Sequence, residues 1–516
     1  MAEEDFTIPQ FIEVPSSGPS FDRWDWLQLG ALFLLWFCLL PLRYDSLPLQ
    51  LWDESHLANS AVEMARSGHW LVPSYDGIPD HWSVKPPLLI WQMAALMWLG
   101  LSPLLAVRLP TMLAALATVG TVWAVCRYGL RDRVAAALAG FLLLSSLYYT
   151  KIHIARTGDY DVPLSFFTLL YVLAFWHSLE RRDRVSISWF AFSAAALFFA
   201  VMTKGVAGTL GLVGLFVFSL TRGKFGKLVG NSRIWLLSLL AVGLCLGYYG
   251  SRELYDPGYL EAVWQNELVD RFFSVNEGHA ERRLFYFVVL GRSFEPCMIL
   301  LPLAALTVLG IDSRRRSLVT LCLFCAAAIL AVLTTSQTKI YWYVASVPPF
   351  LAIAAAVGVS DGLRLIKTHE LRVPKPFRTR PLQVVVGVLL AIASAASIYR
   401  NQVMQMQISE QSWYGALFDE LQSRGYSSVL VLDTEFPALP DNPPLKFYVK
   451  FYAASARNKG LRPEVTREIP ATLPKDELIA TCDPKLTPWL KNGDGFAIVD
   501  QVHSCIFGIA HRLANP

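Results

Sequence analysis

Apolar segments separated by short charged loops make up most of the chain between residues 26 and 398. A membrane-spanning helix needs about 20 predominantly apolar residues, or fewer where aromatic or basic residues cap its ends. The pattern predicts an all-α polytopic membrane domain with about 11–13 transmembrane helices. The apolar segments are 26–42, 105–126, 134–149, 162–179, 186–203, 206–220, 234–249, 296–310, 318–335, 343–359 and 382–398.

A further apolar stretch, residues 86–100, is short and begins with two prolines. Short cytoplasmic loops are enriched in Lys and Arg, so the charged loops indicate whether this stretch crosses the membrane. If it lies along the membrane surface, all the strongly basic loops fall on one side; if it crosses, they are divided between the two sides. We therefore predict an interfacial helix here, a cytoplasmic segment over 1–25 and an outward C-terminus. The basic loops are 126–133, 180–184, 221–233, 312–316 and 364–380.

Two long insertions, residues 44–104 and 251–295, then lie on the outward side of the predicted transmembrane domain, residues 26–399. Both have apolar residues at helical spacing with interleaved aromatic residues, which is typical of helices in the membrane interface. From residue 400 to 516 the chain is no longer membrane-like, and helix patterns alternate with strand patterns. This predicts a small α/β domain outside the membrane. Cys482 and Cys505 lie in it, and the sequence leaves open whether they pair.

Composition agrees with a membrane protein. Hydrophobic residues make up 54% of the chain, charged residues only 17%, and the mean hydropathy is +0.40, which excludes an ordinary soluble domain. The formal net charge of +4 gives no argument for a nucleic-acid partner. The first 24 residues lack a basic start followed by a short apolar core, so we expect no cleavable signal peptide. We expect a multi-pass protein of the cell inner (plasma) membrane, with its active site on the extracytoplasmic side.

Polar residues that could do chemistry gather on the predicted outward face. Each group also has an ordinary structural interpretation: lysines anchor helix ends at headgroups, acidic residues cap helices, and Tyr and Trp form an interfacial belt. The groups are Asp53, Glu54 and Lys85; Arg156, Asp159 and Asp161; Lys204; and Glu267, Arg271 and His279 with Lys339, Tyr341 and Tyr343.

The combination of these groups favours a site. Carboxylates at two separate span mouths, with several cations on the same face, suit a reaction in which a hydroxyl is deprotonated while an anionic group leaves. A lipid phosphate fits that leaving group, because its tail can lie between spans while Lys and Arg hold the phosphate at the interface.

Five segments resemble C-type glycosyltransferases, specifically the bacterial relatives of protein O-mannosyltransferases and the lipid A aminoarabinose transferases. The stretch DESHLANSAVEMARSGHWLVPSYDGIPDHWSVKPPLLIW resembles their first outward loop, and ARTGDYDVPLSFF resembles their second acidic motif. TKGVAG, NELVDRFF and SQTKIYWYVASVPP resemble later blocks, so the resemblance covers residues 51–355 in order. It implies transfer of a sugar from a polyprenyl-phosphate donor on the non-cytoplasmic side, usually with inversion at the anomeric carbon.

Carried over by position, the resemblance makes Asp53 the group that activates the acceptor and places Lys85 near the donor phosphate. The second motif's carboxylate corresponds to Asp161, and Asp159 adds another. Two positions depart from the pattern: His56 replaces a common Arg, and Val84 replaces a Glu that helps to hold a metal in the aminoarabinose-transferase branch. Metal binding by that route is therefore not expected, and aminoarabinose transfer is less favoured as the exact activity.

The sequence thus predicts a membrane glycosyltransferase that uses a polyprenyl-phosphate-linked sugar and a lipid, glycan or protein acceptor. No cofactor and no metal ligand are assigned, although a divalent metal is left open, and membrane lipids are the other partners. The alternatives are a transporter or flippase of lipid-linked saccharides, which would carry ionisable residues in its span centres, and a noncatalytic membrane scaffold. We predict catalytic roles for Asp53, Asp161 and Asp159, and substrate-binding roles for Glu54, Lys85, Arg156, Lys204, Arg271 and Tyr343.

Overall fold

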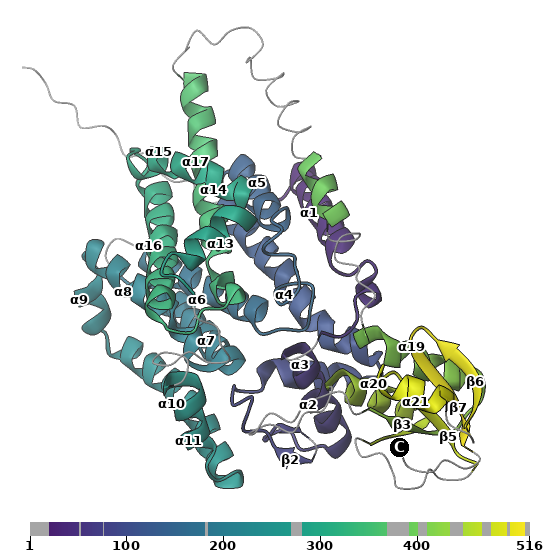
Figure 1. The fold of residues 1–516 in the computed structure, drawn as a ribbon. Coiled ribbons are helices and arrows are strands. Elements are labelled where there is room, and N and C mark those ends of the chain that lie inside the picture. Colours follow the sequence, from purple (N-terminus) through teal and green to yellow (C-terminus); the bar gives the residue numbers. More distant parts are fainter. Residues whose placement is uncertain are drawn as a thin grey trace, which may run out of the picture.

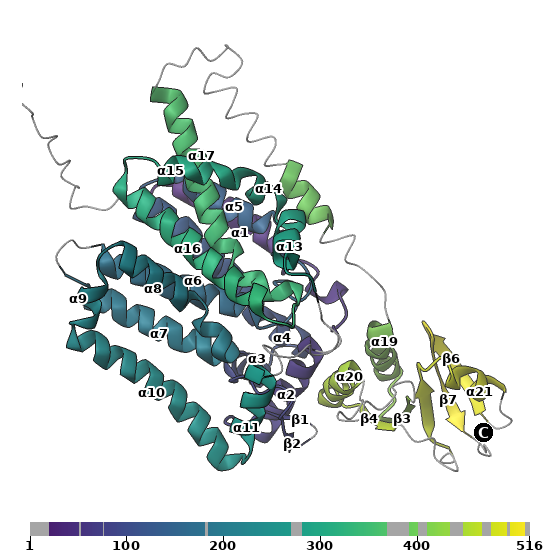
Figure 2. The same cartoon turned by 60° about the vertical axis from the view of Figure 1, so that its left-hand side comes forward.

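A bundle of long helices carries two features at one end: helices that pack across it, and a small α/β unit (Figures 1 and 2). α2 (Asp53–Ser67), α3 (Leu88–Trp98) and the α/β unit share this end, whereas α15 (Ala304–Val308) lies at the other. The computed structural model describes residues 20–50, 53–75, 77–180, 184–269, 281–368, 392–400, 410–433, 447–466, 476–492 and 496–510.

Seven helical segments in the described part are long and apolar enough to cross a membrane, and an eighth follows if one pair bent by 98° counts as a single span. Aspartates cap the N-termini of three helices. The carboxylates of Asp22, Asp132 and Asp312 accept hydrogen bonds from N–H groups of the first turn that have no partner within the helix. The long helices are α1 (Arg23–Leu39), α4 (Pro103–Ala124), α6 (Asp161–Leu179), α7 (Ile187–Lys204), α10 (Ser232–Tyr255), α16 (Ser313–Thr335) and α17 (Pro348–Thr368).

Several predicted spans form shorter or broken helices. Residues 134–149 form α5 (Arg133–Leu144), and residues 206–220 form a 3-10 turn, η3 (Gly205–Thr209), followed by α8 (Gly211–Thr221). Prolines interrupt residues 296–310, which become α14 (Glu295–Leu300), η6 (Leu301–Leu303) and α15. The bent pair joins this region to α13 (Phe285–Ser293). Within the described ranges, seven or eight helical segments are long and apolar enough to span a membrane, compared with the 11–13 transmembrane helices predicted. The described ranges omit most of the predicted span 382–398.

The predicted interfacial stretch becomes α3, a helix of 11 residues. Its length is roughly 16 Å, well below the ~30 Å of a bilayer core, so α3 does not cross. Its apolar face packs on α2 and α4 through Leu89, Ile90 and Met93, while Trp98 at its end is 73% exposed.

The predicted α/β pattern after residue 400 is present. The sheet has the strand order β4-β3-β5-β7-β6; β3 runs parallel to β4 and β5, and β7 runs antiparallel to β5 and β6. Cys482 and Cys505 form a disulfide within this unit. The elements are α19 (Glu410–Ser423), β3 (Ser428–Leu432), α20 (Phe447–Asn458), β4 (Arg462–Thr466), β5 (Leu478–Thr481), α21 (Leu486–Asn492), β6 (Phe496–Val502) and β7 (Cys505–Ala510).

Two apolar cores hold these parts together. The larger one joins α1, α4, α5, α6, α16 and α17 and buries Trp36, Trp123 and Trp176. The second joins α2 and α3 to α19, α20 and the sheet, so the first loop and the C-terminal unit share one core. The start of α2, where Asp53 and Glu54 lie, is therefore fixed from both sides. The remaining elements are η1 (Tyr44–Ser46), β1 (Ser74–Tyr75), β2 (Ile78–Pro79), η2 (Val125–Gly129), α9 (Phe225–Val229), α11 (Tyr259–Val263), η4 (Trp264–Val269) and η7 (Tyr341–Ser346).

Candidate active site

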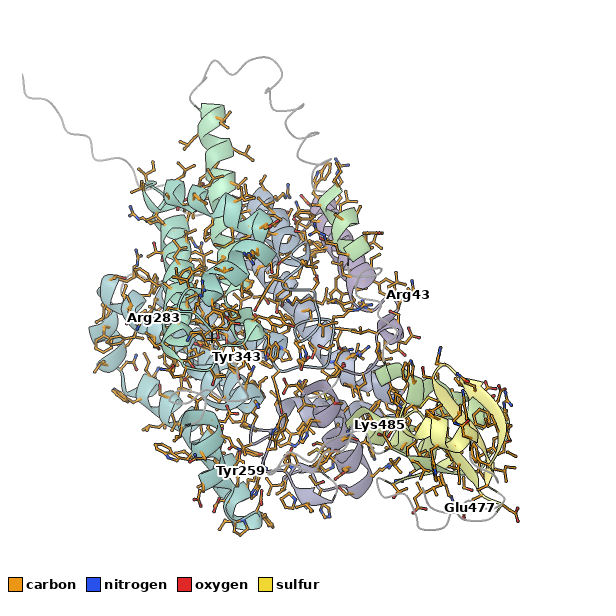
Figure 3. The ribbon with its side chains drawn as sticks, viewed as in Figure 1. Arg43, Tyr259, Arg283, Tyr343, Glu477 and Lys485 are labelled. Atoms are coloured by element: carbon orange, nitrogen blue, oxygen red, sulfur yellow. A yellow bond between two sulfur atoms is a disulfide. The ribbon has the colours of Figure 1, made fainter. Side chains whose placement is uncertain are left out.

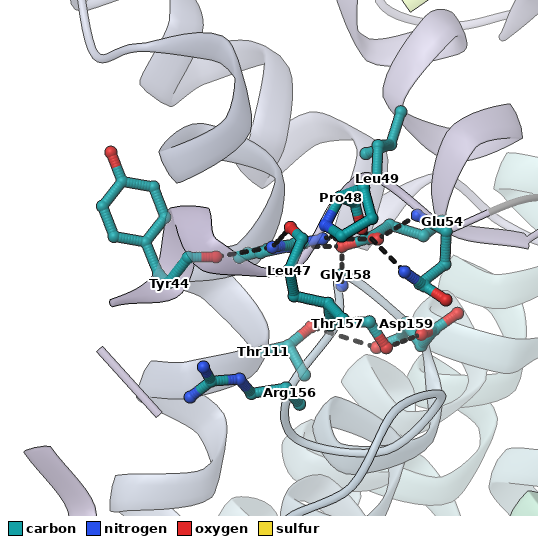
Figure 4. Close-up of polar contacts among 12 residues, drawn as sticks. Tyr44, Leu47, Pro48, Leu49, Glu54, Thr111, Arg156, Thr157, Gly158 and Asp159 are labelled. Atoms are coloured by element: carbon teal, nitrogen blue, oxygen red, sulfur yellow. Dashed lines mark hydrogen bonds and ion pairs between the residues drawn. The ribbon is translucent and has the colours of Figure 1, made fainter. Parts of the chain in front are cut away.

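A fully buried ion pair joins the first loop to the helical bundle (Figure 4). Arg108, on α4, donates from Nε to Glu54 Oε1 at 2.7 Å and from Nη2 to Glu54 Oε2 at 2.9 Å, and both side chains are fully buried. Glu54 also accepts hydrogen bonds from the N–H groups of Gln50 (2.8 Å) and Gly158 (2.9 Å). A buried charge needs such compensation, and here it connects three segments that are distant in sequence.

Arg108 also fixes the chain that leads into α2. Its Nη1 donates to the carbonyls of Tyr44 (2.6 Å) and Leu47 (2.7 Å), and its Nη2 donates to that of Pro48 (2.9 Å). The lone arginine of an apolar helix thereby satisfies several carbonyls of an otherwise irregular segment.

Gly158 permits the close approach of the second acidic motif to α4. A Cβ at this position would lie 2.6 Å from the carbonyl oxygen of Val107, which real side chains do not tolerate. The glycine therefore allows its own N–H to reach Glu54, and the following residue, Asp159, is brought beside the start of α2.

Asp53, His153 and Asp159 form the acidic centre of the site. Their ligand atoms all lie within 4.8 Å of one another. Thr157 Oγ1 donates to Asp159 Oδ2, and His153 Nδ1 lies 4.0 Å from the same oxygen. Burial, and then the nearby Asp53 and Glu54 carboxylates, raise the pKa of Asp159 well above its ordinary value. Burial lowers the pKa of His153, which favours the neutral imidazole.

Asp161 begins α6 and pairs with Lys204 at the end of α7, with 2.6 Å between Oδ1 and Nζ. Lys204 also lies over the ring of Tyr343, 5.0 Å from its centroid, and Tyr343 lies inside the helical part of the molecule (Figure 3). These three residues line a cavity of ≈110 Å³. Its apolar walls are Leu164, Val206, Ala207, Leu210, Ile329, Val332 and Leu333.

Lys85, on the first loop, contacts a residue of the cavity lining. Its Nζ lies 3.4 Å from Glu267 Oε1 on η4, and 5.4 Å from the ring centroid of Tyr160. Glu267 itself lines the cavity. The first and second outward insertions are thus in contact through a lysine–glutamate pair beside the Asp161–Lys204 pair.

Two histidine–aspartate pairs order the first loop further. His56 Nε2 lies 2.6 Å from Asp80 Oδ2, with both side chains almost fully buried. His81 Nε2 lies 2.7 Å from Asp256 Oδ1, at the end of α10. Arg252 donates to the carbonyl of Asp80 at 2.7 Å, so α10 holds the loop that carries Lys85.

Two of the predicted substrate-binding residues occupy structural positions instead. Arg156 is 2% exposed and points away from Asp159 (Figure 4), donating to the carbonyls of Leu39 (2.5 Å) and Arg43 (3.2 Å). Burial, and then the positive charges of Arg108 and Arg43, lower the pKa of Arg156 to about 10. The Glu54 side chain is fully buried, and its partners are Arg108 and the N–H groups of Gln50 and Gly158. Glu54 is therefore also placed as a structural residue and not in contact with a substrate.

The other predicted residues are placed as follows. Lys204 and Tyr343 line the cavity together with Asp161, and Lys85 pairs with Glu267 of the cavity lining. Asp53 and Asp159 lie in the acidic centre. Lys339 donates to the carbonyl of Ser336 at 2.5 Å, which fixes a turn at the end of α16. Arg271 and His279 lie outside the described residues.

Sequence reasoning missed Arg108 and His153. A signal existed for Arg108, because an arginine inside an apolar segment has a structural or functional role by default. For His153 the sequence signal was weaker, because it is a single histidine in the loop just before the second acidic motif. Its left-handed backbone (φ +62°) is visible only in the structure.

Position 84 offers no metal ligand. The Val84 side chain is 1% exposed and packs with Met202, Tyr248 and Tyr259 in a small apolar cluster. Apolar surroundings of this kind do not stabilise an ion.

Comparisons of sequence find relatives among membrane sugar transferases. Residues 84–249 match the family described as dolichyl-phosphate-mannose-protein mannosyltransferase. The chain is 24% identical over 392 residues to an undecaprenyl phosphate-alpha-4-amino-4-deoxy-L-arabinose arabinosyl transferase from Pseudomonas savastanoi, which covers 74% of this chain and 70% of that protein. It is 26% identical over 398 residues to a protein of the same description from Pseudomonas fluorescens, covering 75% and 67%.

Comparisons of structure give the same fold. The crystal structure of ArnT from Cupriavidus metallidurans bound to undecaprenyl phosphate superposes with a TM-score of 0.68 at 17% identity, covering 96% of this chain and 99% of that one. The archaeal oligosaccharyltransferase AglB from Archaeoglobus fulgidus, in complex with an inhibitory peptide and a dolichol-phosphate, gives 0.53 at 13% identity, covering 95% and 74%. The predicted fold class and the resemblance to C-type glycosyltransferases are confirmed.

Proposed function

We propose that the protein is an integral membrane glycosyltransferase that moves a sugar from a polyprenyl-phosphate donor to an acceptor hydroxyl. One observation carries the proposal: a single cavity joins an apolar wall, formed by α6, η3, Leu210 and α16, to a polar head that contains the Asp161–Lys204 pair and Glu267, the partner of Lys85. The relatives named above are transferases, and the predicted enzyme class agrees with them.

The cavity suits a lipid phosphate. Its apolar residues match an isoprenoid tail, and Lys204 and Lys85 offer ammonium groups for the phosphate. Each lysine pairs with a carboxylate, Asp161 or Glu267, so a phosphate can take over a contact that already holds the lysine in position. Tyr343 lies against Lys204 and completes the head of the cavity.

The acidic centre supplies the acceptor side of the reaction. The acceptor oxygen forms a bond to the anomeric carbon, the bond from that carbon to the phosphate oxygen breaks, and polyprenyl phosphate leaves with the electron pair. The acceptor proton passes to Asp53, the half-buried carboxylate at the start of α2. Asp159 and Asp161 position the hydroxyls of the acceptor or of the sugar between Asp53 and the donor phosphate.

The site faces the non-cytoplasmic side in this proposal. α4 carries Arg108 at the site end, and η2, which follows it, carries Arg127 at the other end, where Arg127 pairs with Asp25 at 2.6 Å. The basic loops with Arg133 and Arg315 lie at that second end too, which the positive-inside rule assigns to the cytoplasm. The proposed layout is a cytoplasmic segment 1–25, a transmembrane domain 26–399 and an extracytoplasmic domain 400–516.

The test is release of polyprenyl phosphate from a labelled polyprenyl-phosphate sugar by the purified protein, with envelope lipids, glycans or peptides as acceptors. Asp53→Asn should lower kcat by about 10²–10⁴-fold, the usual contribution of a general base. Lys204→Ala should mainly raise the donor KM, while Lys227→Ala, an exposed lysine of the basic 221–233 loop, should change neither.

Two results would contradict the proposal. One is a wild-type protein that moves uncleaved lipid-linked sugar across vesicles without releasing polyprenyl phosphate, which would favour the transporter alternative. The other is full transfer by Asp53→Asn.

A further inference from the structure

Three successive aromatic residues, Tyr341, Trp342 and Tyr343, form the first turn of η7. A 3-10 helix has about three residues per turn, so consecutive side chains point about 120° apart. The three rings therefore reach different neighbours. Between them they contact both halves of the site: the acidic centre, and the cavity proposed above to hold the lipid phosphate (the lipid-phosphate cavity).

Tyr341 holds the loop that leads into the second acidic motif. Its hydroxyl donates to the carbonyl of Ile152 at 3.1 Å, and its own carbonyl accepts a hydrogen bond from the hydroxyl of Tyr148 at 2.5 Å. The ammonium group of Lys151 lies over the Tyr341 ring, 3.7 Å from its centroid. One residue of η7 thus fixes this loop at three points.

Trp342 contacts the same loop at the residue where its backbone is strained. Its ring stacks on His153, with centroids 4.4 Å apart and planes 17° apart. His153 is left-handed, at φ +62°, a conformation that a non-glycine residue keeps only where its surroundings require it. The N–H of His153 donates to Thr157 Oγ1 at 2.8 Å, and Thr157 in turn donates to Asp159. The stacked ring therefore supports the turn that presents Asp159.

Tyr343 contacts the donor half of the site. The Nζ atom of Lys204 lies 5.0 Å from the centroid of the Tyr343 ring, and Lys204 pairs with Asp161. Tyr343 and Ser346, both in η7, line the lipid-phosphate cavity. One short turn therefore touches the donor side through Tyr343 and the acceptor side through Trp342.

We propose that Trp342 is a positioning residue: through His153 it fixes Asp159 relative to the donor held beside Tyr343. This inference rests on the proposed function, which assigns the acceptor side of the reaction to the acidic centre. Transfer requires the reacting groups to be held closely, because a displacement of about 1 Å can cost about 10²-fold in rate. Adjacent residues of one turn meet this requirement, since the two sides cannot move far apart without breaking η7.

The kinetic test compares Trp342→Ala and Trp342→Phe in the purified full-length protein, with a labelled polyprenyl-phosphate sugar as donor. Trp342→Ala should lower kcat by about 10–10²-fold. The donor KM should stay as in the wild type, because Tyr343 and Lys204 keep their contact. Trp342→Phe keeps a ring that can stack on His153, so it should restore most of kcat. A loss of folded protein alone would not separate kcat from KM in this way.

A double variant tests whether Trp342 acts through His153. The variant Trp342→Ala/His153→Ala should have the same kcat as His153→Ala alone, because the ring that Trp342 supports is already absent. Hydrogen exchange gives a readout that needs no sugar transfer. In Trp342→Ala the amides of residues 152–157 should exchange faster, while those of α7 and α16 should exchange as in the wild type.

Trp189→Ala is the matched control. Trp189 also stacks on a histidine, His177, with centroids 4.8 Å apart and planes 26° apart. This pair lies at the ends of α6 and α7 that are opposite to Asp161 and Lys204. Trp189→Ala should leave kcat, the donor KM and the exchange of residues 152–157 as in the wild type.

Several results would overturn the inference about Trp342: wild-type kcat in Trp342→Ala, a raised donor KM with unchanged kcat, or Trp342→Phe as impaired as Trp342→Ala. Additive losses of kcat in the double variant would exclude a route through His153. Failure of the wild type to transfer sugar would contradict the proposed function instead. In that case unchanged exchange of residues 152–157 in Trp342→Ala would overturn the positioning role as well, and faster exchange would support it.

Discussion

Asp80 orders the first outward loop through a single carboxylate. Its Oδ1 accepts hydrogen bonds from the N–H groups of Trp82 and Ser83, both at 3.0 Å, and its Oδ2 contacts His56. Burial acts to raise the pKa of Asp80, but the His56 imidazole and these N–H groups outweigh it and lower the pKa below its ordinary value. The ionised form of Asp80 therefore stabilises the folded loop that carries Lys85.

Asp80→Asn should lower the free energy of unfolding by about 1.5–3 kcal/mol at neutral pH, the usual range for a hydrogen bond to a charged group. Because the folded pKa lies below the unfolded value of about 3.9, the contribution is present above that pH and is lost as pH falls through the folded pKa. Thermal unfolding in detergent between about pH 7 and pH 3 should show the wild type converging on the variant.

Asp45→Asn is the control for this experiment, since Asp45 is an exposed aspartate of the same insertion. We expect it to change stability by no more than about 0.5 kcal/mol. A constant difference between the wild type and Asp80→Asn down to the lowest pH would mean that the carboxylate charge is not the source of the stability.

The Glu54–Arg108 pair shows how elements distant in sequence are joined. α2 and α4 meet through this pair, and the same glutamate holds the N–H of Gly158 just before the second acidic motif. Asp53 precedes Glu54, and Asp159 follows Gly158, so the pair sets the distance between two proposed functional carboxylates. Glu54 is thus a positioning residue, which explains how an acidic pair can contain one half-buried and one fully buried member.

Glu54→Gln and Arg108→Gln should each destabilise the protein by about 3–5 kcal/mol, because each leaves an uncompensated buried charge. The double variant Glu54→Gln/Arg108→Gln should be destabilised by less than the sum of the two. Unfolding in detergent, analysed as a double-mutant cycle, measures the coupling. Additive effects would show that the two side chains act independently and would contradict the proposed coupling of α2 to α4.

The sequence predicted most of the long helices and their order, but not where some helices break or which side chains pair. Both outcomes have physical reasons. Apolar length identifies α1, α4, α6, α7, α10 and α16 directly, because a bilayer requires it. It does not show where prolines break residues 296–310 or where Gly205, at φ +56°, ends α7. Pairings such as Asp161 with Lys204 depend on how helices pack, and no local pattern contains that information. The same holds for Arg156, whose partners lie on α1 and on the turn that follows it.

The molecule as a whole supports the proposed base from outside the membrane domain. The C-terminal unit shares a core with α2 and α3, and Leu49 donates its N–H to the hydroxyl of Tyr452 on α20 at 3.2 Å. Arg66, near the other end of α2, donates to the carbonyl of Ala454 at 2.6 Å. α20 therefore holds both ends of the segment that presents Asp53.

Tyr452→Phe tests this support, because it removes one hydroxyl and keeps the ring. The lost hydrogen bond should cost about 1 kcal/mol, and hydrogen exchange should become faster in the first turn of α2 while β3 and β5 stay protected. Transfer should then show a lower kcat with an unchanged donor KM, since the lysines around the lipid-phosphate cavity are not touched. Tyr426→Phe, in the same unit with its ring against Phe507, should leave α2 exchange and kcat as in the wild type. If exchange in α2 is unaffected by Tyr452→Phe, the C-terminal unit does not hold the base, and its contact with α2 serves only the stability of that unit.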